Sequence, residues 1–357
     1  MPRVSVVIDT YNQERYIEQA IVSVLEQDFP SSEMEILVVD DGSTDCTPEI
    51  VRKFESRVRL IRKSNGGQAS AFNAGIAEAR AEIIAFLDGD DWWVKEKLSA
   101  VLEAFGKHPD IAAVGHGYFE VNDNNPPSEM VVAAKTCRID VSSGEAASVA
   151  NLGRTLLATS RLAVRRTVLN RIGPLPKALI FCADAPILIL SLALGGALIL
   201  DRPLCYYRHH VASLFAGNSD VSGKSLRKAE MLSVLLDYLP PKLVEMGVPV
   251  EASALVLEAF QIEIDRLHLQ FGQRGRWQSF QLEMRDFRTS YKNANLGYTL
   301  FKGWVAVMAL LLPPRRFYEV RDWYSRKNLK RFRSHFAAAE PAAPPDLFQR
   351  RPVVRQD

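Results

Sequence analysis

The stretch Ile83-Ile84-Ala85-Phe86-Leu87-Asp88-Gly89-Asp90-Asp91 decides the fold that we expect for this chain of 357 residues. Its apolar half is a short, uninterrupted run, which is typical of a strand buried on both faces of a sheet. The acidic half begins where that strand ends. Because ligands of α/β sheets bind beyond the carboxyl ends of the strands, the segment from Asp88 to Asp91 is a candidate ligand site.

The chain before this stretch alternates between strand and helix patterns. Runs rich in β-branched residues and apolar residues at helical spacing predict strands over 4–8, 36–39 and 58–61 and helices over 16–27 and 69–79. Thr47 followed by Pro48 predicts an N-cap with proline in the first helical position. This alternation predicts an α/β fold with a mostly parallel sheet, flanked by helices and joined by right-handed crossovers.

Two further polar clusters follow strands of the expected sheet. Thr10-Tyr11 comes after the first strand and Asp40-Asp41 after the second, so both should share an edge with Asp88. The Tyr11 ring can stack on a nucleotide base, and the Asp41 carboxylate can accept a hydrogen bond from a base imide. An ordinary boundary aromatic and a turn-former are the alternatives. The meeting of three clusters at one edge favours a ligand site.

The acidic cluster is suited to a metal ion, and a glycine-rich loop is suited to the phosphate that accompanies it. Carboxylate oxygens such as those of Asp88 and Asp90 are the ligands that Mg²⁺ and Mn²⁺ prefer, and phosphates commonly complete the coordination. Asn65-Gly66-Gly67-Gln68 precedes a helix, where exposed amides suit an anion. Taken alone, the acidic cluster favours a solvated acidic turn that caps the helix at Lys95, and the glycine-rich loop is equally compatible with a plain turn.

The rest of the chain divides into a second α/β part and a helical part. We expect helices over 95–107 and 184–194, and strands over 111–118, 161–164 and 198–207. Strand patterns are absent after residue 225, and Ala- and Pro-rich sequence begins at residue 337. We therefore expect an α/β domain over 1–217, with halves 1–118 and 119–217, a helical region over 218–336, and a disordered tail over 337–357.

Composition and charge exclude several classes of protein. The net charge of +2 gives no strong field for nucleic acid, so no nucleic-acid partner is expected. The four cysteines are far apart and form no C-x-x-C pair, which favours a reduced, cytoplasmic setting. The N-terminus lacks the features of a signal peptide. The longest apolar run near the other end, residues 304–312, is too short to span a bilayer.

Four blocks over the first hundred residues resemble the glycosyltransferase family 2 proteins. They are Val4-Ser5-Val6-Val7-Ile8-Asp9-Thr10-Tyr11-Asn12, Val38-Val39-Asp40-Asp41-Gly42-Ser43-Thr44-Asp45, Asn65-Gly66-Gly67 with Asn73-Ala74-Gly75, and Phe86-Leu87-Asp88-Gly89-Asp90-Asp91. Their order and spacing make the resemblance specific. In the family, proline commonly precedes the Thr-Tyr-Asn triplet, whereas Asp9 stands there in this chain. We interpret that departure as a change at a backbone position.

The resemblance implies a GT-A fold, a nucleotide-diphosphate-sugar donor, inversion at the anomeric carbon, and Mn²⁺ or Mg²⁺ as cofactor. By position, Tyr11 and Asp41 would hold the base, Asp88 would serve the ribose or the metal, and Asp90 would ligate the metal. Asp91 would support the loop. The remaining matched positions expected at the donor site are Thr10, Gly66 and Asn73.

The second half of the catalytic domain supplies the expected base and a further metal ligand. Residues 159–166, followed by Ile172-Gly173, resemble the acceptor-side segment and lead to Asp184, our candidate for the general base. Ala183 stands where many members have Glu, and a helix cap is the alternative role for Asp184. His210 ends a segment like the family's Tyr-Arg-x-His and is expected near the metal or diphosphate, with a lone surface histidine as the alternative. No Gln-x-x-Arg-Trp segment is present, which favours transfer of a single sugar.

The C-terminal third combines an apolar run with a basic cluster. Residues 300–312 are strongly apolar, and arginines and lysines interleaved with aromatic residues follow from Arg315. This pattern suits the interface of an anionic membrane, where the acceptor would be a lipid-linked saccharide. A core helix followed by a solvated basic helix is the alternative. For the whole chain, a nucleotidyltransferase and a catalytically degenerate nucleotide-sugar binding module are the competing functions.

Overall fold

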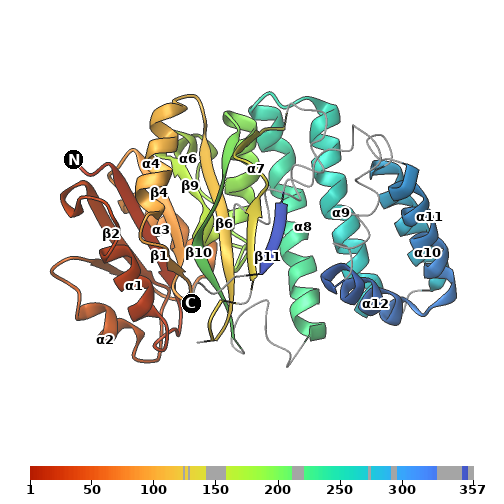
Figure 1. The fold of residues 1–357 in the computed structure, drawn as a ribbon, viewed down its shortest axis with the longest axis horizontal. Coiled ribbons are helices and arrows are strands. Elements are labelled where there is room, and N and C mark those ends of the chain that lie inside the picture. Colours follow the sequence, from red (N-terminus) through yellow and green to blue (C-terminus); the bar gives the residue numbers. More distant parts are fainter. Residues whose placement is uncertain are drawn as a thin grey trace.

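The computed structural model describes residues 1–123, 125–127, 129–141, 158–210, 221–271, 275–290, 296–327 and 348–352. A twisted sheet with helices packed on its faces makes up one part of the molecule, and a group of helices makes up the other (Figure 1). Helix α8 lies between the two parts, and α10, α11 and α12 lie at the end opposite β2 and α2. The expected α/β class with a helical C-terminal extension is confirmed.

Four parallel strands form the first part of the sheet, in the order β3-β2-β1-β4. They are β1 (Val4–Thr10), β2 (Met34–Asp40), β3 (Arg59–Arg62) and β4 (Ile83–Asp88). In their register Asp9 is level with Asp88, and Thr10 is level with Asp40. The polar clusters that follow these strands therefore meet at one edge, as the sequence predicts.

The helices that connect these strands begin close to the predicted positions. They are α1 (Ile17–Leu25), α2 (Thr47–Arg52), α3 (Gln68–Glu78) and α4 (Lys97–Lys107). The predicted N-cap of α2 is wrong by one residue, because Thr47 is the first helical residue and Cys46 is the cap. Asp45 Oδ1 accepts the Thr47 amide, and Thr47 Oγ1 instead accepts the amide of Gln13 from the loop after β1.

The second part of the sheet is mixed, so the whole is less parallel than we expected. It contains β5 (Trp92–Trp93), β6 (Ala113–Asn122), β7 (Glu129–Ala133), β8 (Cys137–Ile139), β9 (Ala163–Arg165) and β10 (Ala197–His209). Strand β9 pairs antiparallel with both β4 and β6, whereas β10 runs parallel to β6. The connection from β6 to β7 is too short for a crossover, and such short connections join antiparallel strands.

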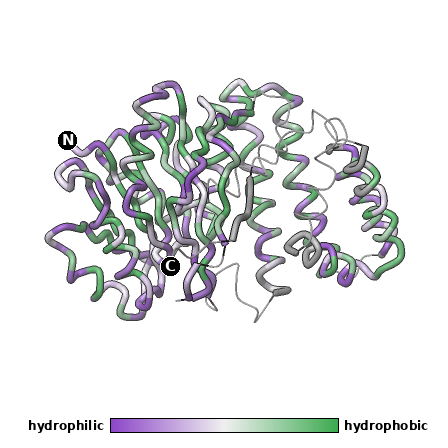
Figure 2. Tube along the Cα trace, in the orientation of Figure 1, coloured by the Kyte–Doolittle hydropathy of each residue, from purple (hydrophilic) through white to green (hydrophobic). Residues whose placement is uncertain are grey.

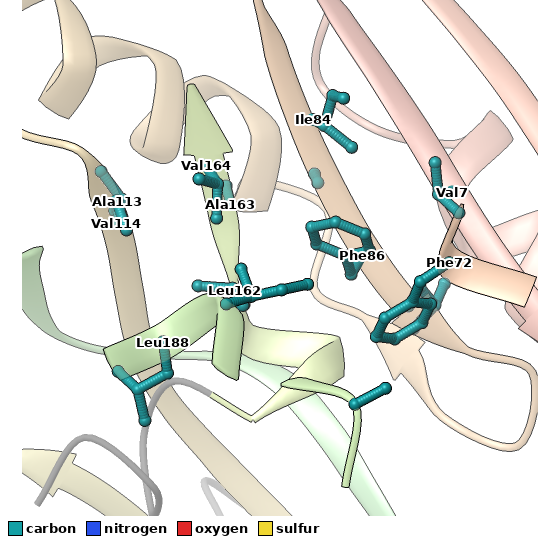
Figure 3. Close-up of a cluster of buried hydrophobic side chains, with 14 of the residues drawn as sticks. Val7, Phe72, Ile84, Phe86, Ala113, Val114, Leu162, Ala163, Val164 and Leu188 are labelled. Atoms are coloured by element: carbon teal, nitrogen blue, oxygen red, sulfur yellow. The ribbon is translucent and has the colours of Figure 1, made fainter. Parts of the chain in front are cut away.

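A buried apolar cluster joins the two parts of the sheet to the helices above them. The side chains of Phe72 on α3, Phe86 on β4 and Leu162 before β9 are all fully buried. Figure 3 shows Leu162 in the middle of this cluster, and the rings of Phe72 and Phe86 lie 4.9 Å apart. The Phe86 amide also donates to the Leu162 carbonyl. The segment that leads into β9 is therefore held directly against the strand that carries Asp88.

The remaining helices are α6 (Arg166–Ile172), α7 (Asp184–Leu194), α8 (Val221–Glu245), α9 (Val250–Phe271), α10 (Arg276–Ser290), α11 (Leu296–Leu311) and α12 (Pro314–Lys327). Helix α8 contacts α7 and α9. A small separate core lies among α9, α10, α11 and α12, and it includes Leu282 and Tyr318. The predicted boundary at residue 217 lies outside the described residues. In the described part of the chain, no helix is both long enough and apolar enough to cross a bilayer.

Strand β11 (Phe348–Pro352) lies inside the segment that we expected to be a disordered tail. It pairs antiparallel with β7. The backbone groups at the edge of a sheet can pair with an added strand whatever its side chains, which is why composition alone did not predict this element. Residues 337–347 and 353–357 lie outside the described residues.

Two helical glycines should respond oppositely to alanine. A Cβ atom on Gly75 of α3 would lie 2.5 Å from Val7 Cγ1, whereas one on Gly106 of α4 would have no described atom within 4 Å. We expect Gly75→Ala to lower the free energy of unfolding by about 1–3 kcal/mol because the buried β1 side chain must move. Gly106→Ala should raise it by about 0.5–1 kcal/mol through helix propensity. Urea unfolding curves test both, and a stabilised Gly75→Ala protein would contradict the packing described here.

Candidate functional site

A cavity of about 730 Å³ opens at the edge of the sheet where the parallel strands end. Residues from β1, β4, β10, the start of α7 and helix α8 line it. Those that the sequence predicted are Thr10, Tyr11, Asp41, Asp88, Asp90, Asp184 and His210. Tyr11 is half exposed, whereas Asp41 is buried. The tertiary structure thus gathers most of the predicted residues around one space.

Asp90 and His210 meet although they are far apart in the sequence. The Nε2 atom of His210, which follows β10, lies 3.0 Å from Asp90 Oδ2. The imidazole also packs on the Tyr16 ring, with centroids 4.5 Å apart. This contact gives the two predicted metal ligands a common position at the cavity.

Asp91 joins three separate segments from its buried position. Its Oδ2 atom accepts a hydrogen bond from the Ser160 hydroxyl at 2.6 Å, and its Oδ1 atom accepts the backbone amide of Arg208 at 2.9 Å. Burial, followed by the charge of Asp90, raises the pKa of Asp91 to about 7. The structure gives Asp91 a supporting role in which it connects the acidic loop to the segment before β9 and to β10.

Arg208 holds the acidic loop from the other side. Its Nε atom donates to the Asp90 carbonyl at 2.9 Å. The guanidinium group lies 4.6 Å from the centroid of the Tyr16 ring and 4.5 Å from that of Trp92. We did not single out this residue from the sequence, although it lies in the segment that was matched for His210. Its two ring contacts depend on segments that only folding brings together.

The glycine-rich loop is held by a protein carboxylate. The amides of Gly66 and Gly67 donate to the Asp41 carboxylate at 2.7–3.1 Å, and Lys63 Nζ lies 2.5 Å from Asp41 Oδ1. Gly67 has a φ of +81°, and a Cβ atom there would lie 2.5 Å from the backbone of Ile180. The anion that these amides bind in this structure is therefore Asp41, whereas we expected an anionic ligand.

Gln68 and Asn73, both on α3, contact the segment that leads into α7. Gln68 Nε2 donates to Asp88 Oδ1 at 3.2 Å, and Gln68 Oε1 accepts the Ala183 amide at 3.1 Å. Asn73 pairs with both backbone groups of Leu175, at 2.8 and 2.9 Å. Asn73 is not among the residues that line the cavity. Asn73 therefore holds the segment around Leu175 against α3, and it does not join the predicted residues that line the cavity.

Asp184 is the first residue of α7 and lines the same cavity. Its Oδ2 atom accepts the backbone amide of Thr159 at 3.2 Å. Thr159 Oγ1 in turn lies 3.3 Å from Gln68 Nε2, and Gln68 also contacts Asp88. Asp184 is thus linked through Thr159 and Gln68 to the acidic cluster.

Asp9 is a site residue whose role the sequence reasoning missed. It stands level with Asp88 on the neighbouring strand and lines the cavity. Its Oδ1 atom is buried without a hydrogen-bond partner among the described residues. Burial, followed by the charge of Asp90, raises the pKa of Asp9 to about 8. Burial and Asp9 likewise raise the pKa of Asp88 well above its usual range. The signal available in the sequence was an acidic residue at the carboxyl end of an apolar strand pattern.

The donor set fits a divalent cation that arrives with phosphate. Within the described residues, no group of three or more His, Cys, Asp and Glu side chains is arranged to hold a metal alone. Asp90 and His210 are in contact, and Asp88 lines the same cavity. Because Mg²⁺ is commonly held by one or two carboxylates together with substrate phosphates, this partial set is chemically sufficient for such an ion.

Comparison with known sequences gives a consistent result. Residues 5–170 match the family model of glycosyl transferase family 2. An uncharacterized glycosyltransferase of Nostoc sp. is 34% identical over 256 residues, which cover 69% of this chain and 77% of that protein. The poly(ribitol-phosphate) β-N-acetylglucosaminyltransferase TarS of Staphylococcus aureus is 37% identical over 112 residues, which are 30% of this chain and 20% of TarS.

Solved structures share the fold at low sequence identity. TarS residues 1–349 in complex with UDP-GlcNAc align with a TM-score of 0.51 and 20% identity over 86% of this chain and 90% of that one. The mannosyltransferase PcManGT of Pyrobaculum calidifontis, in complex with GDP-Man and Mn²⁺, aligns with a TM-score of 0.50 and 21% identity over 90% and 84% of the two chains. These likenesses confirm the expected GT-A fold.

The buried carboxyl groups predict a pH-dependent stability. Asp9, with its pKa raised from 3.8 to about 8, keeps its proton in the fold where the unfolded chain has lost it. The resulting stabilisation is complete at low pH and is lost as the pH rises through about 8. In EDTA, we expect the free energy of unfolding to fall by at least about 1 kcal/mol between about pH 5.5 and pH 8.5. Urea unfolding at each pH measures this difference.

The variant Asp9→Asn keeps the shape of the side chain without its charge, and it should reduce the pH dependence. The exposed carboxylate of Asp237 provides a matched control, and Asp237→Asn should leave the dependence as it is in the wild-type protein. An Asp9→Asn protein with the full wild-type dependence would show that Asp9 is not the titrating group.

Proposed function

The chain belongs to glycosyl transferase family 2, and we propose that it is an inverting glycosyltransferase that moves one sugar from a nucleotide-diphosphate-sugar. The acceptor in this proposal is a saccharide or a lipid-linked saccharide, in the synthesis of a cell-surface polysaccharide on the cytoplasmic side of the membrane. The observation that carries the proposal is that Asp90 and His210, two contacting side chains of types that ligate metals, line the same cavity as Asp184.

The donor would bind with its base at the end of β1. Tyr11 has 47% of its surface exposed beside the cavity, which leaves the ring accessible for stacking on a base. Asp41 lines the same region, and its contacts with Gly66 and Gly67 limit how far it can move. The TarS and PcManGT complexes contain nucleoside-diphosphate sugars, which supports this class of donor. We assign no particular base or sugar.

The diphosphate would lie beside the acidic loop. Asp90 and His210, with Asp88, are the residues that would hold Mn²⁺ or Mg²⁺, and the neighbour PcManGT was solved with Mn²⁺. When bound, such a cation neutralises the charge that develops on the departing diphosphate. Arg208 and the ring of Tyr16 fix the positions of the Asp90 carbonyl and the His210 ring, so that the ligands are preorganised.

Asp184 is our candidate for the general base. In the proposed step, the acceptor hydroxyl oxygen forms a bond to the anomeric carbon while its proton passes to the Asp184 carboxylate. The bond between the anomeric carbon and the diphosphate oxygen breaks, and the nucleoside diphosphate takes the electron pair. The hydrogen bond from the Thr159 amide to Asp184 Oδ2 orients the carboxylate at the cavity.

Removal of the metal ligand should abolish turnover. We expect Asp90→Ala to lower the rate of nucleoside-diphosphate release by about 100-fold or more, because the charge on the departing diphosphate is then no longer neutralised. The assay screens several nucleotide-sugars in the presence of Mn²⁺, with Asp237→Asn as the control variant. Full activity of Asp90→Ala, or wild-type activity in EDTA, would contradict a metal-dependent transfer.

The general base should be separable from donor binding. We expect Asp184→Asn to lower kcat by about 10²–10⁴-fold, because the amide cannot accept the proton, while donor affinity measured by calorimetry stays within a few-fold of wild type. Retained activity in Asp184→Asn would exclude this residue as the base. If the wild-type protein binds a donor but turns over none in the presence of saccharide acceptors, the catalytically degenerate binding module becomes the preferred function.

A further inference from the structure

Helix α11 has apolar side chains on two sides. One side contributes Val305, Met308 and Ala309 to the small core shared with α9, α10 and α12. The other side carries Leu300, Trp304, Val307 and Leu311, which are 66, 60, 51 and 62% exposed. We call these four residues the α11 stripe. Their spacing of four, three and four residues places them in one line along the helix.

The α11 stripe is larger than the isolated apolar residues that are normal on protein surfaces. Contiguous apolar patches of large side chains mark sites that bind a partner or a membrane. Helix α11 lies at the far end of the molecule from β2 (Figure 1), and Figure 2 shows hydrophobic residues along the outer side of this helical group. Among the described residues, the four side chains of the stripe are exposed at a face that a large partner could contact.

The segment that contains the stripe has an excess of positive charge. Residues 276–327 contain ten lysines and arginines and four acidic residues, which gives a net charge of +6 in a chain whose total is +2. Arg315 and Arg316 are exposed and follow Leu311 by four and five residues, and Arg315 pairs with Glu319 of the same helix. An apolar line beside a basic cluster matches the chemistry of an anionic lipid surface, where apolar side chains enter the acyl boundary and cations meet the headgroups.

The same charges disfavour a second copy of the chain as the occupant. Two copies that met through their stripes would bring two regions of net charge +6 together. Like charges that are juxtaposed at an interface oppose association. Trp304, at the middle of the stripe, is a residue type that is enriched at membrane–water interfaces.

We propose that the α11 stripe, together with Arg315 and Arg316, docks the protein on the surface of an anionic lipid bilayer. The helix lies in the plane of the interface and does not cross the bilayer. This inference goes beyond the proposed glycosyl transfer, because docking requires no donor, metal or turnover.

Ion pairs connect this surface to the cavity. Lys228 of α8 lines the cavity and lies 2.8 Å from Glu263 of α9. Arg266 lies 3.5 Å from Glu263 and 3.4 Å from Glu283 of α10, and α10 packs on α11. Because the side chains of Arg266 and Glu283 are largely buried, these pairs hold the helices in a fixed arrangement. These contacts therefore link the helix that carries the stripe, through α10 and α9, to a residue of the cavity wall.

The test measures co-flotation of the full-length protein with vesicles of phosphatidylcholine, alone or with about 30% phosphatidylglycerol. We expect binding to the anionic vesicles only, and release at high salt because the basic cluster is screened. Trp304→Ser combined with Val307→Ser should weaken the partition coefficient about tenfold or more. Arg315→Glu combined with Arg316→Glu should weaken it by a similar factor.

Matched control variants test whether vesicle binding depends on this surface or on the total exposed apolar area and net charge of the protein. Val244 and Val250 are 73 and 77% exposed on other helices, so that Val244→Ser with Val250→Ser removes exposed apolar surface elsewhere. Lys53→Glu with Arg171→Glu makes the same change in net charge at exposed positions that are far in sequence from the α11 stripe. Both control variants should bind vesicles like the wild-type protein, and unchanged thermal unfolding would establish that all variants fold.

Two results would overturn the proposal. The first is equal binding of the stripe variants and the controls to anionic vesicles. The second is the absence of vesicle binding together with a wild-type dimer, seen by sedimentation, that Trp304→Ser with Val307→Ser converts to monomers. That outcome would assign the stripe to a second copy. Neither result depends on glycosyl transfer, so a failure of docking would leave the proposed activity as it stands.

Discussion

The carboxylate of Asp91 is the contact on which the site depends. By accepting hydrogen bonds from Ser160 and from the amide of Arg208, it joins the end of β4 to the segment before β9 and to β10. Arg208 then binds the Asp90 carbonyl, and His210, the residue after β10, contacts the Asp90 carboxylate. The antiparallel pairing of β5 with β10 and the contacts of Arg208 and His210 with Asp90 add to this tie and fix the acidic loop against the end of β10.

The site concentrates like charges at a cost to the stability of the fold. Asp9, Asp88 and Asp90 line one cavity with Asp184, and burial raises the pKa values of Asp9 and Asp88. Such an arrangement is unfavourable for a protein alone, because desolvated carboxylates repel one another. A cation that arrives with a diphosphate would relieve the repulsion. The site is therefore better suited to a bound ligand than to the empty protein, as is common at functional sites.

Most of the first hundred residues could be predicted because local pattern and tertiary structure agree there. Strands β1, β2 and β4 are largely buried apolar runs, whereas β3 is only partly buried, and each helix buries one face, so periodicity locates them. The mixed part of the sheet was harder, because β9 has only three residues and pairs with strands distant in sequence. The C-terminal strand β11 was missed because its pairing depends on backbone groups of β7 and not on its own side chains.

The amino-acid sequence was sufficient to place Tyr11, Asp41, Asp88 and Asp90 at one edge, because the carboxyl ends of parallel strands coincide. Only the tertiary structure decided what each residue contacts. In the fold, the amides of Gly66 and Gly67 donate to Asp41, Asn73 is hydrogen-bonded to the backbone of Leu175, and Asp9 lies beside Asp88. The physical reason is that strand order, register and loop packing follow from long-range burial and hydrogen bonding, which no local pattern of residues encodes.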